Sequence, residues 1–67
     1  MTIFVNNQPV ELTGKLTIPQ LLRDQQVAHL KGLAIAINDF VITKSDWEQV
    51  VFQENDQVTI IRASQGG

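Results

Sequence analysis

The sequence ends on two glycines, Gly66 and Gly67, directly after the polar residues Ser64 and Gln65. A glycine pair can enter a passage too narrow for any side chain, and its backbone adopts angles that other residues avoid. With glycine at roughly 7% of average usage, a chance pair has odds of about 0.5%. We therefore expect the terminal carboxylate of Gly67 to be the working group, carried into a partner's active site by a tail of Ser64, Gln65 and Gly66.

The chemistry open to this carboxylate depends on activation by another protein. An ionised carboxylate is stabilised by resonance and does not react with nucleophiles, so a partner must first convert it into an activated ester, for which ATP is the obvious source. Attack on an acyl-adenylate by sulfur gives a thiocarboxylate or thioester, whereas attack by an amine gives an amide. We therefore expect a protein co-substrate rather than an enzyme, with no cofactor bound by the chain itself.

The other groups that act in catalysis lack the necessary neighbours in the sequence. A nucleophile needs a base beside it, but the single histidine, His29, accompanies no G-x-S-x-G motif, and a chain without cysteine has no thiolate for a metal site. The isolated Gly14 and Gly32 form no phosphate-binding loop. Two carboxylate pairs fall in predicted turns, where acidic residues usually cap or solvate the backbone: Asp46 with Glu48, and Glu54 with Asp56.

Length and composition indicate one small globular domain. The 67 residues are 43% hydrophobic and 18% charged, which is typical of a chain with a core and excludes the composition of a disordered segment. The net charge is −2, and five scattered Lys and Arg residues argue against nucleic acid as a partner. No run approaches the ~20 apolar residues that span a bilayer and no signal-peptide pattern occurs, so we expect a cytoplasmic protein without membrane contact.

The alternation of apolar and polar residues predicts an α+β fold with a mixed sheet. Residues 45–48 have the spacing of a capping box and predict one helical turn, on which Trp47 is expected to close the small core rather than hold a ligand. Residues 50–52 are predicted to be a brief strand or extended segment. The strands of the sheet are predicted at residues 1–5, 8–12, 33–37, 40–42 and 57–62.

A short amphipathic helix is predicted between the second and third strands. Thr17 and Gln20 have the spacing of a capping box, Pro19 fits the first turn, and the helix is expected to run to about Gln26. A helix this short is marginal alone in water, so it must lie against the sheet. Its apolar face is predicted to consist of Ile18, Leu21 and Leu22.

The side-chain patterns of two predicted strands indicate how neighbouring elements pack against them. Residues 33–37 place large residues on one face and alanines on the other, which suggests that the alanine face packs closely against the helix or a partner. Residues 57–62 have apolar side chains on both faces, which is typical of an interior strand. Residues 1–62 are expected to form the folded domain, and residues 63–67 a flexible tail that reaches roughly 16 to 18 Å when extended.

Four segments spread over nearly the whole chain carry a family signature. They are Gly32-Leu33-Ala34-Ile35-Ala36-Ile37-Asn38, Lys44-Ser45-Asp46-Trp47, Glu54-Asn55-Asp56-Gln57-Val58 and Gly66-Gly67. Together they resemble the ThiS family, the sulfur carrier proteins of thiamin biosynthesis. The resemblance implies a ubiquitin-like β-grasp roll, in which a mixed sheet cups one short helix and a flexible tail leaves the last strand.

The resemblance also implies a reaction cycle. The Gly67 carboxylate would be adenylated by a ThiF-like enzyme using ATP and converted into a thiocarboxylate with sulfur derived from cysteine, which a ThiG-like thiazole synthase would take. MoaD-like carriers of molybdenum cofactor synthesis share the fold and the ending, and this chain's shorter length and Ser45-Asp46-Trp47 segment favour the thiamin pathway. Two further alternatives are a ubiquitin-like protein modifier, which would form conjugates on lysines, and an interaction module with an idle tail.

Overall fold

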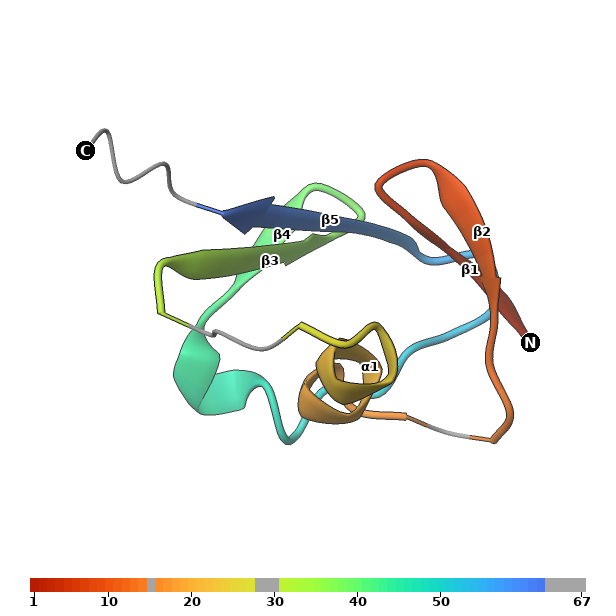
Figure 1. Ribbon diagram of the computed structural model, residues 1–67, viewed down its shortest axis with the longest axis horizontal. Coiled ribbons are helices and arrows are strands. Elements are labelled where there is room, and N and C mark those ends of the chain that lie inside the picture. The colour runs from red at the N-terminus through yellow and green to blue at the C-terminus, as the bar shows by residue number, and fades with distance from the viewer. Residues whose placement is uncertain (15, 28–30, 63–67) are drawn as a thin grey trace.

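The computed structural model describes residues 1–14, 16–27 and 31–62, and the elements in these ranges follow the predicted order (Figure 1). No helix among them is long and apolar enough to cross a membrane. The elements are β1 (Thr2–Val5), β2 (Gln8–Glu11), α1 (Ile18–Asp24), β3 (Leu33–Ile37), β4 (Phe40–Ile42), the 3-10 helix η1 (Lys44–Asp46) and β5 (Gln57–Arg62).

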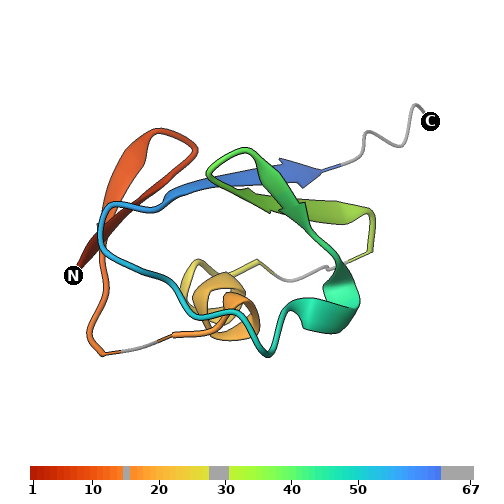
Figure 2. The ribbon, with the colours of Figure 1, turned by 180° about the vertical axis from the view of Figure 1, so that it is seen from behind.

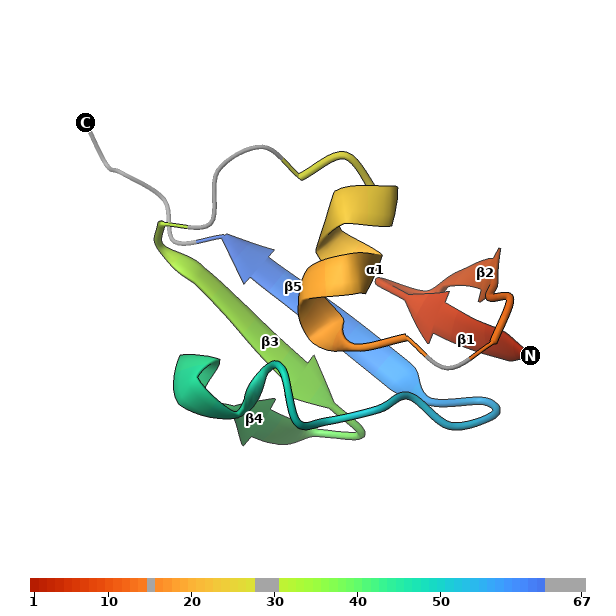
Figure 3. The same ribbon diagram turned by 90° about the horizontal axis from the view of Figure 1, so that it is seen from below.

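The five strands form one mixed sheet in the order β2-β1-β5-β3-β4. β1 runs parallel to β5, whereas the pairs β1–β2, β3–β4 and β3–β5 are antiparallel, as can be followed in Figure 3. The hairpins β1–β2 and β3–β4 are thus joined through β5, which lies between them. The prediction that residues 57–62 form an interior strand is confirmed.

The core lies between the sheet and a layer made of α1 and η1. Both helices lie on one side of the sheet, and no helix of the described residues lies on the other side (Figures 1 and 2). The predicted apolar face of α1 is confirmed, since all three of its side chains are buried. The buried cluster consists of Ile3, Val5, Leu12, Ile18, Leu21, Leu22, Ile35, Trp47, Phe52 and Val58.

α1 begins where the sequence provides partners for its first backbone groups. The N–H of Thr17 donates to Gln20 Oε1 at 2.9 Å, which is the side-chain-to-backbone bond that a capping box requires of its third helical residue. Pro19 lies in the first turn, where a missing N–H removes no intrahelical bond. The predicted start of the helix is therefore confirmed.

α1 ends at Asp24, two residues before the predicted boundary, because a Schellman motif closes it. The N–H of Gln26 donates to Arg23 O at 3.0 Å, and the N–H of Val27 donates to Leu22 O at 2.9 Å. These two bonds satisfy carbonyl groups that the last helical turn leaves without partners. The motif needs a left-handed residue at Gln26, whose φ is 62°.

Replacement of Gln26 by glycine is expected to stabilise the protein. A left-handed conformation costs roughly 1–2 kcal/mol for a residue with a Cβ, and glycine gives back part of this through its freer unfolded state, which leaves a gain of about 0.5–1 kcal/mol. Urea denaturation measures the change. Gln25→Gly is the matched control, because Gln25 has a φ of −84° and its replacement removes no strain. A gain of stability in both variants would mean that the left-handed backbone at Gln26 is not the cause.

The helical turn predicted at residues 45–48 begins too late. The observed turn is η1, and its N-cap is Thr43 rather than Ser45. The N–H of Asp46 donates to Thr43 O at 2.9 Å, and the Thr43 hydroxyl donates to Asp46 Oδ2 at 3.2 Å. Thr43 and Asp46 are therefore joined at the start of the turn, although no side chain caps a backbone N–H as a capping box requires.

Trp47 closes the core beside β4, as predicted. Its side chain is 3% exposed, and its indole Nε1–H donates to Ile42 O at 3.1 Å, so the polar atom of the ring has a partner. Lys44 Nζ lies 5.6 Å from the ring centroid, within the range of a cation–π contact. Burial of this large ring gives a physical reason for the start of the turn at Thr43.

Residues 50–52 form an extended segment instead of a regular strand. One isolated bridge joins Val51 to Thr17, and the N–H of Phe52 donates to Leu16 O at 3.3 Å. The Phe52 side chain is buried in the core, whereas Val51 is 40% exposed. The segment thereby links the start of α1 to the core without extending the sheet.

Candidate functional site

The predicted working residues Ser64, Gln65, Gly66 and Gly67 lie outside the described residues. The structure describes the strand that precedes them, β5, which ends at Arg62. The candidate site is therefore built from β5 and from the elements around its last residues.

β5 is held by hydrogen-bonded neighbours up to its end. It pairs with β3 from Val58 to Arg62 and with β1 at Gln57 and Val58. On the side of β1, the N–H of Ile60 donates to Asn6 Oδ1 at 2.9 Å. The chain that follows Arg62 therefore starts from a fixed position at one end of the sheet.

The face of the sheet opposite α1 carries an apolar surface around β5. Strand register places Ile61 beside Ala34, and it places Ala36 between Thr59 and Val41. Val41 is 70% exposed and Ile61 is 50% exposed. We call these five residues the open sheet face. Exposed apolar side chains that gather on one face are typical of surfaces that bind other proteins.

The alternation predicted for residues 33–37 is present, but its alanine side does not face the helix. The three large residues pack into or against the core, whereas Ala34 and Ala36 lie on the open sheet face. The helix packs on the large side because long apolar side chains gain most from burial. Ala36 is 8% exposed, so its neighbours cover most of its surface on this face.

A groove of about 330 Å³ lies at the edge of the sheet beside β4. Phe40 at this edge is 74% exposed. Phe40 pairs with Ile37, at the opposite end of β3 from the Leu33–Arg62 pair. The groove is therefore far along the sheet from the end of β5. It is lined by Ile37, Asn38, Phe40, Ile42, Val50, Val51, Gln53 and Asp56.

Both carboxylates of the predicted turn pair Glu54 and Asp56 accept hydrogen bonds that hold backbone segments together. Asp56 Oδ2 accepts a hydrogen bond from the N–H of Gln53 at 2.8 Å, and its Oδ1 accepts one from Asn38 Nδ2 at 3.0 Å. Glu54 Oε2 accepts one from the N–H of Thr2 at 3.2 Å. These bonds fix the loop before β5 to the β3–β4 turn and to the start of β1.

The described residues contain no group of three or more His, Cys, Asp or Glu side chains that could hold a metal ion. His29, whose sequence neighbours do not favour a catalytic base, lies outside the described residues. The Ser45 hydroxyl lies 3.3 Å from the Thr43 hydroxyl, beside the cap of η1. The role predicted for Ser64 to Gly67 therefore stays a prediction.

The topology defines the class of the protein. A mixed sheet has β1 and β5 parallel in its interior, one helix in the crossover from β2 to β3 covers one face, and β5 precedes a chain end of two glycines. This is the ubiquitin-like β-grasp fold.

Solved structures share this fold. The crystal structure of the thiamine biosynthesis protein ThiS from Geobacter metallireducens has a TM-score of 0.85 to this chain, at 23% identity, with both chains fully covered. The solution structure of a thiamine biosynthesis protein from the same organism has a TM-score of 0.78, at 23% identity, and covers 100% of this chain and 88% of that one. These likenesses confirm the predicted β-grasp roll.

Sequence comparison identifies the family. The model of the ThiS family matches residues 3–67. The sulfur carrier protein ThiS of Escherichia coli (strain K12) is 32% identical over 69 aligned positions, which cover 100% of both chains. The uncharacterized protein ycf40 of Trieres chinensis is 27% identical over 66 positions, covering 98% of this chain and 89% of that protein. The chain therefore belongs to the ThiS family of sulfur carrier proteins.

Val41 and Ile61, the two large residues of the open sheet face, are not among the residues predicted from sequence to act in the site. The sequence does contain a signal for these two residues, namely the number of predicted helices compared with the number of apolar sides of the predicted strands. A chain whose strands are apolar on both sides needs helices on both sides to cover them. This sequence predicts one short helix and one helical turn, so apolar side chains are expected on the side of the sheet that these two elements leave open.

Proposed function

We propose that the protein carries sulfur, as a thiocarboxylate at Gly67, for formation of the thiazole ring of thiamin. A ThiF-type enzyme binds ATP and adenylates the Gly67 carboxylate. Sulfur derived from cysteine then replaces AMP, and a ThiG-type thiazole synthase takes the sulfur from the thiocarboxylate. The carrier works in the cytoplasm, and its partners supply the ATP and the catalytic residues.

The acyl chemistry of the proposal balances in two steps that load the sulfur and one step that releases it. One carboxylate oxygen attacks the α-phosphorus of ATP and pyrophosphate leaves, which gives a mixed anhydride with a good leaving group. Sulfur at the oxidation level of sulfide attacks the acyl carbon, and AMP leaves with the oxygen that formed the first bond. When the synthase later takes the sulfur, water supplies the oxygen that restores the carboxylate.

The match to the ThiS family up to Gly67, at the end of a chain that finishes on two glycines, is the observation that carries this proposal. The geometry of β5 supports it, since the strand is held to its last residue and the remaining five residues reach roughly 16 to 18 Å when extended. A folded body can then bind the partner while the carboxylate enters the active-site cleft.

Intact mass spectrometry tests the proposal. The protein co-expressed with a ThiF-type enzyme and a cysteine-dependent sulfur donor is expected to gain the mass difference between one sulfur and one oxygen, located at the C-terminal residue by fragmentation. Expression with the enzyme but without the sulfur donor is the control. Recovery as conjugates on lysines of other proteins, or only with the large subunit of molybdopterin synthase, would contradict the assignment.

We further propose that the ThiF-type enzyme docks on the open sheet face. The apolar residues of this face flank β5, so a partner that covers them lies directly beside the strand that continues into the tail. Apolar area removed from water stabilises such a contact by roughly 25 cal/mol per Å². The half-exposed Ile61 is the residue of this face closest in sequence to the tail.

Val41→Ala is expected to weaken binding of the ThiF-type enzyme by up to about 15-fold, because each buried methylene-sized group contributes about 0.8 kcal/mol. Val51→Ala is the matched control. It removes the same atoms from a partly exposed side chain that lies away from the open sheet face, and it should change Kd by less than about twofold. Isothermal titration calorimetry measures both values. Equal losses for the two variants would rule out docking through this face.

A further inference from the structure

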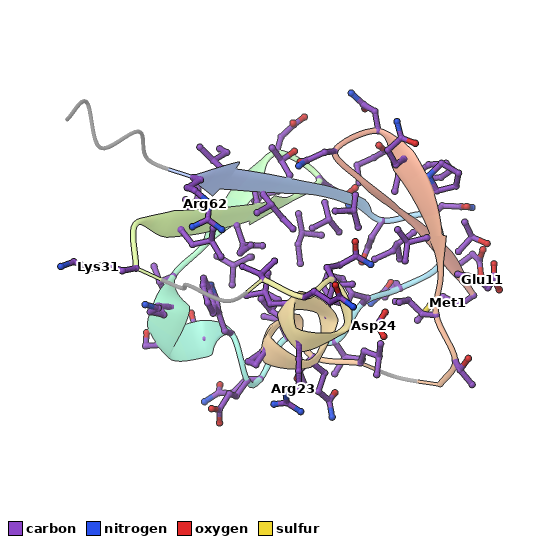
Figure 4. The ribbon with its side chains drawn as sticks, in the orientation of Figure 1. Met1, Glu11, Arg23, Asp24, Lys31 and Arg62 are labelled. Atoms are coloured by element: carbon purple, nitrogen blue, oxygen red, sulfur yellow. The ribbon has the colours of Figure 1, made fainter. Side chains whose placement is uncertain are left out.

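Basic residues that are scattered in the sequence gather at the end of the sheet where β5 stops. Arg62, the last residue of β5, pairs with Leu33, and Lys31 precedes Leu33 by two residues. Figure 4 shows Lys31 and Arg62 at this same end of the molecule. Both side chains are exposed. Two cations from different segments of the chain therefore lie at the end of the sheet where β5 stops.

A third cation reaches this end from the other side of β3. Ile42, the last residue of β4, pairs with Ile35, and the chain then continues in the direction of the β3 start to the exposed Lys44. Asp46 and Glu48 follow Lys44 in the sequence and offset part of the positive charge. Among the described residues, this end holds three cations and two carboxylates.

The opposite end of the sheet is acidic. Asp56 precedes β5 and bonds to Asn38 in the β3–β4 turn, and Glu54 bonds to the N–H of Thr2 at the start of β1. The Thr2 hydroxyl donates to Glu11 Oε1 at 2.6 Å. The described carboxylates at this end are Glu11, Asp39, Glu54 and Asp56.

One cation, the ammonium group of Met1, lies 3.0 Å from Glu11 at the acidic end. The hydrogen bond from Thr2, and next to it the hydrogen bond and charge of this ammonium, lower the pKa of the Glu11 carboxyl, so it stays ionised at neutral pH. Among the described residues, four carboxylates and one cation lie at this end, and Figure 4 shows Met1 and Glu11 far from Lys31 and Arg62. The domain therefore has opposite charge at its two ends.

We propose that Lys31, Lys44 and Arg62 form a guide surface that steers the tail-bearing end of the domain onto acidic side chains around the active-site entrance of the ThiF-type enzyme. The inference rests on the proposed function, because it concerns the same binding of the ThiF-type enzyme. It adds that the active-site entrance of that enzyme is acidic. Complementary charge raises association rates and suppresses wrong orientations more than it raises final affinity.

The arrangement suits a carrier whose working group is itself an anion. The terminal carboxylate has to approach acidic side chains and the phosphates of ATP, and cations at the base of the tail offset this repulsion. The same acidic rim repels the end that holds Glu11 and Glu54, so a reversed encounter is disfavoured. The net charge of the protein is −2, so the protein as a whole does not attract an acidic partner. The attraction between the guide surface and the acidic side chains therefore acts only at short range, within a Debye length of about 8–10 Å.

Stopped-flow association with a fluorescently labelled ThiF-type enzyme tests the guide surface. Lys31→Glu is expected to slow association by about 3- to 10-fold at low ionic strength, and by less than twofold near 1 M salt, where the Debye length is about 3 Å. Arg23→Glu changes the net charge equally at an exposed position on α1, away from the guide surface, and should change the rate by less than about twofold. Circular dichroism checks the fold of each variant. If either variant unfolds, the single variants Lys31→Gln and Arg23→Gln are compared instead.

The salt dependence of the two variants decides whether the guide surface acts as proposed. A salt-sensitive loss of rate in Lys31→Glu alone supports it. Equal losses in both variants would mean that net charge acts instead, and a loss that persists near 1 M salt would mean a short-range contact, so either result overturns the proposal. Failure of the underlying function is seen separately, because the unaltered protein would then gain no sulfur in intact mass spectrometry.

Discussion

Deletion of Gly67 is expected to abolish thiocarboxylate formation while the domain stays folded. The buried core of the described chain lies between Ile3 and Val58, so the deletion removes no core side chain. The truncated chain presents its carboxylate one residue short, by about 3.3–3.6 Å, and a misplacement of about 1 Å can already cost 100-fold in rate. Intact mass spectrometry after co-expression with the ThiF-type enzyme and a sulfur donor measures the loss, and thermal unfolding checks the fold.

The matched control is the full-length protein with a C-terminal amide, which keeps every residue and removes only the acid. It is expected to melt at the temperature of the unaltered protein and to accept no sulfur. Gly66→Phe is expected to show the same loss for a different reason, because its ring blocks entry into a narrow cleft. Normal thiamin-independent growth of a strain that carries the deletion would refute the role of Gly67.

Replacement of Leu21 or Ile35 by alanine is expected to lower the free energy of unfolding by roughly 2–5 kcal/mol. Both side chains are 1% exposed or less and lie in the one core cluster, Leu21 from α1 and Ile35 from the sheet. The effect is large because a domain of this size has a total stability of only about 3–10 kcal/mol, at 0.05–0.15 kcal/mol per residue. Urea denaturation followed by circular dichroism measures the change.

Ile61→Ala provides the control for Ile35→Ala, because it removes the same atoms from a neighbouring strand. Its side chain is 50% exposed on the open sheet face, so we expect a loss below about 1 kcal/mol. A similar loss at both positions would mean that Ile35 is not packed more tightly than Ile61. It would then contradict the assignment of the core to the helix side of the sheet.

The elements could be predicted where local chemistry and burial favour the same structure. Thr17 and Gln20 make the hydrogen bond that their spacing in the sequence predicts, and the apolar face of the helix that follows lies in the core. The five strands were predicted to within one residue at each end, since their alternation matches one buried side. The family resemblance, now confirmed, came from segments that include β3 and the turn before β5.

The errors lie where two local solutions compete. Thr43 and Ser45 both precede an acidic residue by three positions, and the observed turn begins after Thr43 and ends at the buried Trp47. The end of α1 was predicted too late because a left-handed Gln26 is uncommon for a residue with a Cβ.

The surfaces around the candidate site depend on strand order, which local patterns do not contain. Arg62 and Lys31 are far apart in the sequence and lie at the same end of the sheet because β5 pairs with β3. Val41 and Ile61 share a surface because both neighbour the alanines of β3. The roles of Ser64 to Gly67 stay predictions, because these residues lie outside the described part of the chain.

The central position of β5 has a consequence for synthesis of the protein on the ribosome. In a nascent chain that has not yet reached residue 57, the strands can form only two separate hairpins, because the strand that joins them is made last among the described elements. Isolated two-stranded hairpins are marginally stable at best in water. Translation that stops early therefore yields a fragment without a stable sheet and without the glycine end. Under the proposed function, the fold thereby couples completion of the polypeptide to its loading with sulfur.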